Sequence, residues 1–330
     1  MPRLLKVMIA ILVVVAAGCG QSPPSAPKAH PGTDALEKPH LVVGSMLIPD
    51  AAPLHIAQRS GLFAAEGLTV EIETVQGGGY AIPKLVGGSM DVAILNYITA
   101  IKAHSQDVKL ALIADGYQAA PETFLLMVAK DSPVRSPADL RGKTIAVATL
   151  RSIGTLTVEV ALKAHGLTAE DVTMVEIPLP NMPAALKAGT VDALWMTEPF
   201  ITAAGTSLGA RKIYDVMSGP TADFPIAGWG TSATFAAKNP KTVAAFQRAM
   251  ARAQHLAASN REAVTAILPT YTKINEETAK IITLGRFPTT LERQRLQRVA
   301  DTMTEYRYLD KPVDVSEMLA PAATTTGGTP

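Results

Sequence analysis

Short apolar runs alternate with helical segments along this chain, and this alternation constrains its fold more than any other feature. Apolar runs predict strands over 41–44, 68–75, 91–95 and 109–113, and helical patterns separate them. Continuous apolar strands joined by helical crossovers are typical of a parallel sheet that is buried on both faces. The first third of the chain therefore predicts an α/β lobe.

The same order of elements then repeats. Strands are predicted over 143–148, 172–177 and 191–196, with helices over 155–165 and 182–187. A short motif recurs 101 positions later, so that Leu85, Gly88 and Asp91 match Leu186, Gly189 and Asp192. Duplication of a lobe explains the match, and so does a helix-to-strand turn that both lobes share. Either origin gives two similar α/β lobes.

Two extended segments, 124–130 and 224–232, flank the second lobe. A chain that leaves one lobe, builds another and returns forms a two-stranded hinge, and two lobes on a hinge can close on a ligand between them. We therefore predict two doubly wound α/β lobes with a ligand cleft between them. The first lobe is expected to comprise 40–130 and 225–319, including C-terminal helices over 243–258 and 291–308, and the second 131–224.

The N-terminus has the features of a secretory signal. Arg3 and Lys6 precede an apolar run over 7–17. As a helix this run rises only about 16 Å, too little for a hydrocarbon core of roughly 30 Å. The sequence before Cys19 resembles a lipoprotein cleavage site, although Ala16 replaces the usual leucine. We expect a signal peptide over 1–19, lipidation of Cys19, a Pro/Ser-rich tether over 20–39 and a disordered tail over 320–330. The alternative is a secreted protein without an anchor.

Composition excludes several other classes of protein. Thirty basic and 29 acidic residues give a net charge of +1, without the basic excess of a nucleic-acid binder. A single cysteine excludes a disulfide framework and a multi-cysteine metal site. No HExxH motif is present in the sequence. We predict no catalytic residues, no metal and no cofactor, and so a protein that is not an enzyme.

Three segments resemble a known family. The run over 53–68 is similar to the opening of type II periplasmic solute-binding proteins, in the branch that binds nitrate, sulfonates or taurine and includes thiamine-pyrimidine-precursor binders. Segments 139–147 and 195–200 match the same family, and the resemblance spans roughly 41–303. It implies a monomeric, extracytoplasmic receptor that delivers a small polar organic solute or oxyanion to an ABC permease and its ATPase. Alternatives are a sensor lipoprotein and a thiamine-pyrimidine-synthase-like enzyme; the latter carries a cysteine-rich iron motif that this chain lacks.

Ligands of parallel α/β lobes bind beyond the carboxyl ends of the strands. The loops at those ends, together with the second hinge segment, supply the candidate ligand-binding residues, which are Asp50, Gly78, Gly79, Tyr80, Asn96, Tyr97, Arg151, Ser152, Asn181, Glu198 and Trp229. The glycine turn and the Arg151–Ser152 pair precede helices, where N–H groups, a guanidinium and a hydroxyl can bind an oxyanion. Trp229 offers an aromatic face.

The charged candidates favour different ligands. Arg151 favours an anion, whereas Asp50 and Glu198 would repel one and favour an amine or a ring N–H. Each also has a structural alternative, since Asp50 and Glu198 can cap helices and Arg151 can lie on the surface. The sequence leaves open which of the three face the cleft, and therefore the identity and charge of the ligand.

Overall fold

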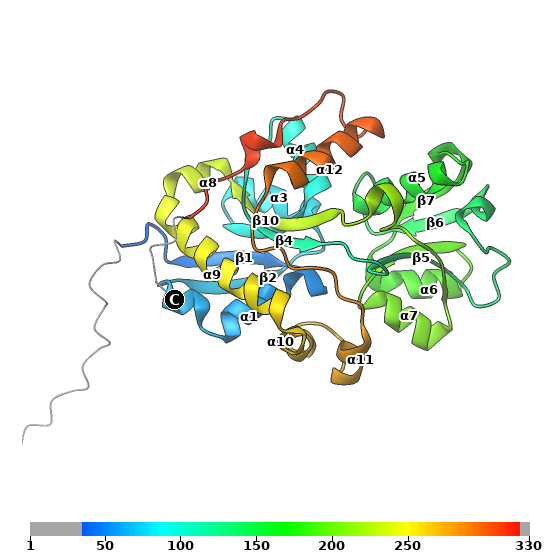
Figure 1. Cartoon of the computed structure of the whole chain (residues 1–330), viewed down its shortest axis with the longest axis horizontal. Coiled ribbons are helices and arrows are strands. Elements are labelled where there is room, and N and C mark those ends of the chain that lie inside the picture. The colour runs from blue at the N-terminus through cyan, green and yellow to red at the C-terminus, as the bar shows by residue number, and fades with distance from the viewer. Residues whose placement is uncertain (1–34, 324–330) are drawn as a thin grey trace, which may run out of the picture. The chain divides into compact units, whose positions relative to one another are not determined.

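The computed structural model describes residues 35–323, and two five-stranded sheets organise it (Figure 1). The signal peptide, the lipidation site Cys19 and most of the tether predicted from the sequence lie outside the described residues, as does the end of the tail. Among residues 35–323, no helix combines the length and the apolar character that a membrane span requires.

The first sheet has the strand order β2-β1-β3-β10-β4. Its strands are β1 (His40–Ser45), β2 (Thr69–Thr74), β3 (Val92–Asn96), β4 (Leu110–Gln118) and β10 (Pro225–Ser232). Strand β1 pairs in parallel with β2 and β3, as the apolar pattern predicts, and β10 inserts antiparallel between β3 and β4. We call this sheet and the helices packed on it the first lobe.

The second sheet repeats this plan with the order β7-β6-β8-β5-β9. Its strands are β5 (Phe124–Val128), β6 (Thr144–Val147), β7 (Thr173–Glu176), β8 (Ala193–Thr197) and β9 (Arg211–Asp215). Strand β6 is parallel to β7 and β8, and β5 takes the antiparallel place that β10 has in the first sheet. This sheet and its helices form the second lobe, and the predicted fold of two α/β lobes is confirmed.

One predicted boundary is wrong. Strand β5 was assigned to the first lobe, within 40–130, but it lies in the second sheet between β8 and β9. All five of its residues are buried, because both edges of the strand are paired and both faces are covered. The first crossing between the lobes is therefore 119–123, and the return crossing is 216–224.

The recurring motif makes the same turn in both lobes. Gly88 and Gly189 have left-handed φ angles of 77° and 69°, which glycine adopts without the penalty of a Cβ atom. Asp91 donates its N–H to Val42 O and accepts from Val42 N, at 2.9 Å each. Asp192 makes the equivalent pair with Thr144, at 2.8 and 2.9 Å. Asp91 therefore fixes the start of β3 against β1, and Asp192 fixes the start of β8 against β6.

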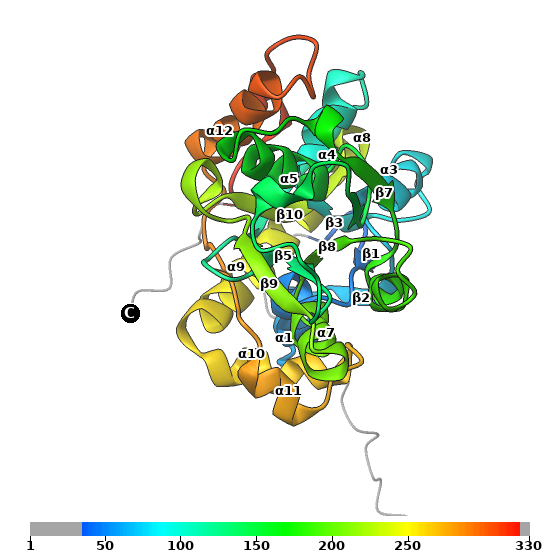
Figure 2. The same ribbon diagram turned by 90° about the vertical axis from the view of Figure 1, so that its right-hand side faces the viewer.

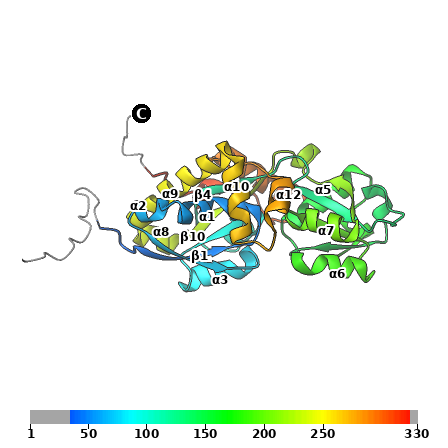
Figure 3. The same cartoon turned by 90° about the horizontal axis from the view of Figure 1, so that it is seen from below.

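Helices cover both sheets (Figures 2 and 3). The first lobe carries α1 (Ala52–Arg59), α2 (Leu62–Ala65), α3 (Gly78–Gly87) and α4 (Tyr97–Ser105), and the second carries α5 (Ile153–Ala164), α6 (Met182–Lys187) and α7 (Phe200–Leu208). The C-terminal part adds α8 (Ala233–Lys238), α9 (Pro240–Ser259), α10 (Arg261–Ile267), α11 (Glu276–Ile281) and α12 (Arg293–Glu305). Helix α9 packs on α1 and α2, and α12 packs on α4. The long C-terminal helices therefore complete the first lobe.

A third segment supports the hinge. After α11, residues 282–287 lie along the end of β4, directly before the first crossing, where Gln118 and Arg286 exchange backbone hydrogen bonds of 3.0 and 2.9 Å. The Arg286 guanidinium also pairs with Asp223 on the return crossing, at 2.6 Å. The hinge thus consists of two crossing segments and a third segment that is bonded to the return crossing and to the end of β4 where the first crossing begins.

Candidate ligand-binding site

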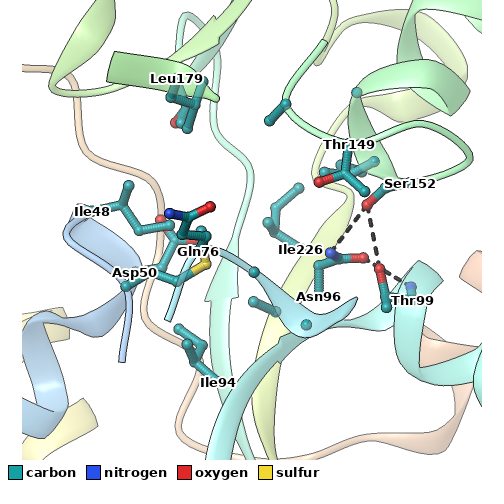
Figure 4. A pocket seen from close by; sticks show the side chains of 18 of the residues that line it. Ile48, Asp50, Gln76, Ile94, Asn96, Thr99, Thr149, Ser152, Leu179 and Ile226 are labelled. Atoms are coloured by element: carbon teal, nitrogen blue, oxygen red, sulfur yellow. Dashed lines mark hydrogen bonds between the residues drawn. The ribbon is translucent and has the colours of Figure 1, made fainter. Parts of the chain in front are cut away.

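A pocket lies between the lobes, at the carboxyl ends of strands from both sheets (Figure 4). Its volume is about 70 Å³, which suits a small solute in this arrangement of the lobes. The first lobe contributes Met46, Ile48, Asp50, Gln76, Gly77, Gly78, Gly79, Ile94, Asn96, Thr99, Ile226 and Ala227. The second contributes Phe124, Ala148, Thr149, Ser152, Ile153, Gly154, Leu179, Trp195 and Thr197.

Hydrogen bonds join the two lobes at one side of this pocket. Asn96 follows β3 and caps α4, because its Oδ1 accepts the Thr99 N–H at 2.9 Å. This leaves the Asn96 amide nitrogen free to donate to Ser152 Oγ of the second lobe, at 3.1 Å. The Thr99 and Ser152 hydroxyls are a further 3.3 Å pair (Figure 4). The three side chains therefore hold the lobes together over the pocket.

Three helices begin at the same side. The first turns of α3, α4 and α5 start at Gly78, Tyr97 and Ile153, each next to residues that line the pocket. The first N–H groups of a helix lack intrahelical partners and carry partial positive charge, so they favour acceptor oxygens of a ligand. A Cβ atom on Gly78 would lie 3.3 Å from Thr99 Cγ2, so glycine lets α3 approach α4 closely.

Asp50 lies on the other side of the pocket, with Ile48 and Gln76 (Figure 4). It follows β1 in a short 3-10 turn (Pro49–Ala51) and is only 2% exposed. Its Oδ1 makes no hydrogen bond to any residue in 35–323. Burial raises the pKa of the Asp50 carboxyl from 3.8 to about 7. The helix-capping alternative for Asp50 is wrong, and its carboxyl is available to a ligand.

Five of the residues predicted from the sequence line this pocket: Asp50, Gly78, Gly79, Asn96 and Ser152. The other six do not. Tyr80 lies on the outer face of α3 and is 55% exposed. Asn181 is exposed in a 3-10 turn (Leu179–Asn181), and Leu179 from the same turn lines the pocket instead.

Tyr97 and Trp229 belong to the core of the first lobe. The Tyr97 hydroxyl donates to Asp115 Oδ1 at 2.7 Å, and the Arg295 guanidinium pairs with the same carboxylate at 2.8 Å. Trp229 is fully buried, with its ring edge-on to Phe246. Both side chains were predicted to contact a ligand, and their packing inside the lobe keeps them away from the pocket.

Arg151 lies on the surface rather than in the pocket. Its backbone has a left-handed φ of 52°, and its guanidinium stacks over the Tyr308 ring at 4.9 Å. One guanidinium nitrogen donates to Arg307 O at 3.2 Å. These contacts connect the start of α5 to the chain that follows α12, so Arg151 joins the two lobes outside the pocket.

Glu198 has a structural role. Its carboxylate accepts the Thr202 N–H at 3.1 Å and the Thr202 hydroxyl at 2.8 Å, and so caps α7. It also accepts the Thr283 N–H of the hinge segment at 3.2 Å. Burial raises the pKa of Glu198 in spite of these hydrogen bonds. Both structural alternatives for this residue, capping and pairing with the hinge, are realised.

The prediction missed several polar residues of the pocket. Gln76, Thr149 and Thr197 each follow the last residue of a predicted strand, so the carboxyl-end rule carried a signal for all three. Thr99 carried no such signal, because it lies within a helix. Within 35–323, no group of three or more His, Cys, Asp or Glu side chains is arranged to hold a metal ion.

Solved structures with this architecture include periplasmic binding proteins and an enzyme. The alkanesulfonate-binding protein SsuA from Xanthomonas axonopodis pv. citri superposes with a TM-score of 0.73 at 20% identity, over 87% of this chain and all of that one. The nitrate-binding protein NrtA from Synechocystis PCC 6803 gives 0.72 at 19% identity, over 87% of each chain. The desulfurization enzyme DSZB has the same fold, with a TM-score of 0.63 at 18% identity over 86% and 97% of the two chains. The fold is that of the periplasmic binding proteins.

The chain belongs to the NMT1/THI5 like family, whose model matches residues 48–263. Among curated relatives, the taurine-binding periplasmic protein of Escherichia coli is 27% identical over 208 residues, 62% of each chain. YtlA of Bacillus subtilis is 23% identical over 205 residues, 62% of this chain and 61% of that one. The chain therefore spans about three fifths of the length of these two relatives.

Proposed function

We propose that this protein is the extracytoplasmic solute-binding protein of an ABC importer. The observation that carries the proposal is a pocket shared by two lobes, with hydrogen bonds from Asn96 and Thr99 to Ser152 across it. Taurine- and nitrate-binding proteins among its relatives support the same function. The ligand is a small polar organic solute or an oxyanion.

Binding and closure are coupled in this proposal. Asn96 and Thr99 stand on the first lobe and Ser152 on the second, so their hydrogen bonds form only when the lobes approach. A ligand that contacts both walls of the pocket stabilises this closed arrangement, because it has fewer contacts when the lobes are apart. The crossings 119–123 and 216–224 are where the chain bends.

The partners and the location follow from the same proposal. A permease receives the solute, and the ATPase that is bound to the permease drives the import. The protein itself acts as a monomer. Lipidation of Cys19 with two acyl chains would anchor the protein to the outer surface of the membrane, because a single acyl chain retains a protein only weakly. The tether over 20–39 would then connect the anchor to the first lobe.

Binding without catalysis is the function we favour. The Ser45 hydroxyl contacts His55 Nε2 at 3.3 Å, but neither residue lines the pocket. The pocket's own serine, Ser152, contacts Asn96 and Thr99 rather than a base. Similarity to DSZB at 18% identity concerns the fold alone.

The test is thermal unfolding and small-angle X-ray scattering of the purified protein against a panel of nitrate, alkanesulfonates, taurine, pyrimidines and small amines. A ligand at 100 times its dissociation constant stabilises the folded state by about 2.7 kcal/mol. The same ligand is expected to favour the closed arrangement in scattering. Ser152→Ala is expected to weaken the response, whereas Ser105→Ala, an exposed serine bonded to its own helix, is the matched control. A panel that stabilises nothing would contradict the proposal.

A further inference from the structure

Asp50 is the one ionisable side chain that lines the pocket among the described residues, and no lysine, arginine or histidine stands beside it there. The remaining polar side chains of the lining are amides and hydroxyls, apart from the Trp195 indole, whose N–H donates to Thr157. A ligand that carries only negative charge would meet a carboxyl group and no cationic side chain. The charge of the pocket therefore differs from that expected for an oxyanion site built on arginine or lysine.

The Asp50 carboxyl also has an unused hydrogen-bonding position. The buried Asp115 carboxylate accepts from Tyr97, Arg295 and its neighbour Gly116. Asp50 Oδ1 is equally inaccessible but is without a hydrogen-bond partner in residues 35–323. Leaving a buried acceptor unpaired costs the desolvation free energy of that group, and this cost is larger when the group is charged. A donor supplied by a ligand would remove this cost.

The groups packed around Asp50 do not supply that donor. Tyr117 of β4 and Tyr271 lie close enough to interact with Asp50, since burial raises the pKa of both hydroxyls and the Asp50 charge raises it further. The Tyr271 hydroxyl donates to Ile48 O at 3.0 Å, and the Tyr117 hydroxyl accepts from Gly285 N. His55, stacked on Tyr271, has a pKa lowered by burial to about 4 and is neutral at physiological pH. The Arg261 charge partly offsets the raised pKa of Tyr117, and its guanidinium donates to Ile282 O. Arg261 forms no ion pair with Asp50 in the described part of the chain.

We propose that Asp50 is the specificity residue of this pocket and binds a nitrogen donor of the ligand, an ammonium group or a ring N–H. The inference rests on the proposed solute-binding function and narrows its substrate class to amine-bearing solutes. Ile226 lies between Asp50 and the polar side of the pocket, and further apolar side chains, Ile48 and Ile94, line the pocket near Asp50 (Figure 4). They suit the carbon skeleton of a small solute, whose acceptor atoms lie toward Asn96 and Ser152.

Pairs of probes that differ by one amine test this inference. Calorimetric titrations compare 2-aminoethanesulfonate with ethanesulfonate, and 4-aminopyrimidine with pyrimidine. At least one amine-bearing probe is expected to bind at least tenfold more tightly than its partner without the amine, equivalent to about 1.4 kcal/mol. Binding of an ammonium group should also release a proton near neutral pH, because the Asp50 carboxyl then ionises. Titrations in two buffers of different ionisation enthalpy measure that proton.

Variants separate the carboxyl from the shape of the pocket. Asp50→Asn keeps the size of the side chain and is expected to abolish both the tenfold preference and the proton release. Asp50→Ser is the second variant, in case the first does not fold. Glu198→Gln is the matched control, since it changes another buried carboxyl that lies outside the pocket, and it should keep the preference.

Each outcome decides between the two proposals. Equal binding of ethanesulfonate and 2-aminoethanesulfonate, or an unchanged preference in Asp50→Asn, would overturn the role of Asp50 and leave solute binding intact. Tight binding of nitrate that Asp50→Asn does not weaken would have the same consequence. Absence of binding by every probe at millimolar concentration would overturn both proposals.

Discussion

Two buried carboxyl groups, one in each lobe, have opposite roles. Asp50 follows β1 and Glu198 follows β8, and they are 2% and 3% exposed. Burial raises the pKa of both. Glu198 accepts three hydrogen bonds from Thr202 and Thr283, whereas Asp50 Oδ1 accepts none from the described residues. Hydrogen bonding, rather than burial, therefore separates the carboxyl that supports the fold from the one that is available to a ligand.

The largest expected effect concerns Asp50 and pH. Its pKa is raised from 3.8 to about 7 in the folded protein, so the folded state binds this proton more tightly than the unfolded state. The stabilisation is complete below pH 3.8 and is lost as the pH rises through about 7. A pKa shift of about three units corresponds to about 4 kcal/mol, which is the free energy of unfolding that Asp50 should cost the protein between pH 3.8 and pH 7.

Urea unfolding of ligand-free protein across this range checks the prediction. The difference between wild type and Asp50→Asn isolates Asp50, because the slopes contributed by Glu198 and other carboxyls cancel. The stability of wild type should fall relative to the variant as the pH rises. A difference that stays constant between pH 4 and 7 would show that Asp50 does not titrate in this range.

The next effect concerns Glu198. Glu198→Ala removes the acceptor of three hydrogen bonds and leaves the Thr202 and Thr283 N–H groups without it. We expect a loss of about 3 kcal/mol in the free energy of unfolding, with the ligand preference of the pocket unchanged. Urea denaturation measures the loss, and Glu198→Gln, which keeps one acceptor oxygen, should lose less. A Glu198→Ala protein as stable as wild type would remove the distinction between the two carboxyls.

A smaller effect is expected at the contact between lobes inside the pocket. Ser152→Ala removes the hydrogen bonds to Asn96 and Thr99, which favour closure. The closed arrangement should lose about 1 kcal/mol of stability, which weakens ligand binding severalfold. Most of this change should appear as faster dissociation of the ligand rather than as slower association. Titration of any probe that binds wild type measures this change. Unaltered affinity would mean that these hydrogen bonds do not contribute to closure.

The smallest effect is expected at the contact between lobes outside the pocket. The Lys163 ammonium pairs with Glu305 at 2.8 Å, and both side chains are more than half exposed. Exposed ion pairs are screened by water and salt. Lys163→Ala should therefore change neither affinity nor the unfolding midpoint measurably. A change as large as that in Ser152→Ala would show that the outer contact also controls closure.

Local patterns predicted much of the fold. Apolar runs located nine of the ten strands in residues 35–323, and the spacing of leucine, glycine and aspartate marked a turn that both lobes use. Strand β9 was missed because Arg211, Lys212 and Asp215 interrupt its apolar pattern at the edge of a sheet. The lobe of β5 was misassigned because an apolar strand does not reveal which neighbours it pairs with.

The candidate site was predictable only in part. The carboxyl-end rule led to Asp50, Asn96 and Ser152, since the position of a loop on a parallel sheet follows from strand order. The rule failed for Tyr97, and the hinge-segment argument failed for Trp229, because the direction of each side chain depends on its packing, against Asp115 and Phe246 respectively. The rule failed for Arg151 because its partners, Arg307 and Tyr308, are far away in the sequence.

The sequence by itself determined the elements, the two-lobe plan and the loops from which a site is built. These depend on the period of apolar residues and on turn residues, which act over a few positions of the chain. The tertiary structure decided which carboxyl group remained free for a ligand. That outcome depends on whether donors distant in the sequence, such as Thr283 for Glu198, reach the group, and for Asp50 no donor in the described residues does.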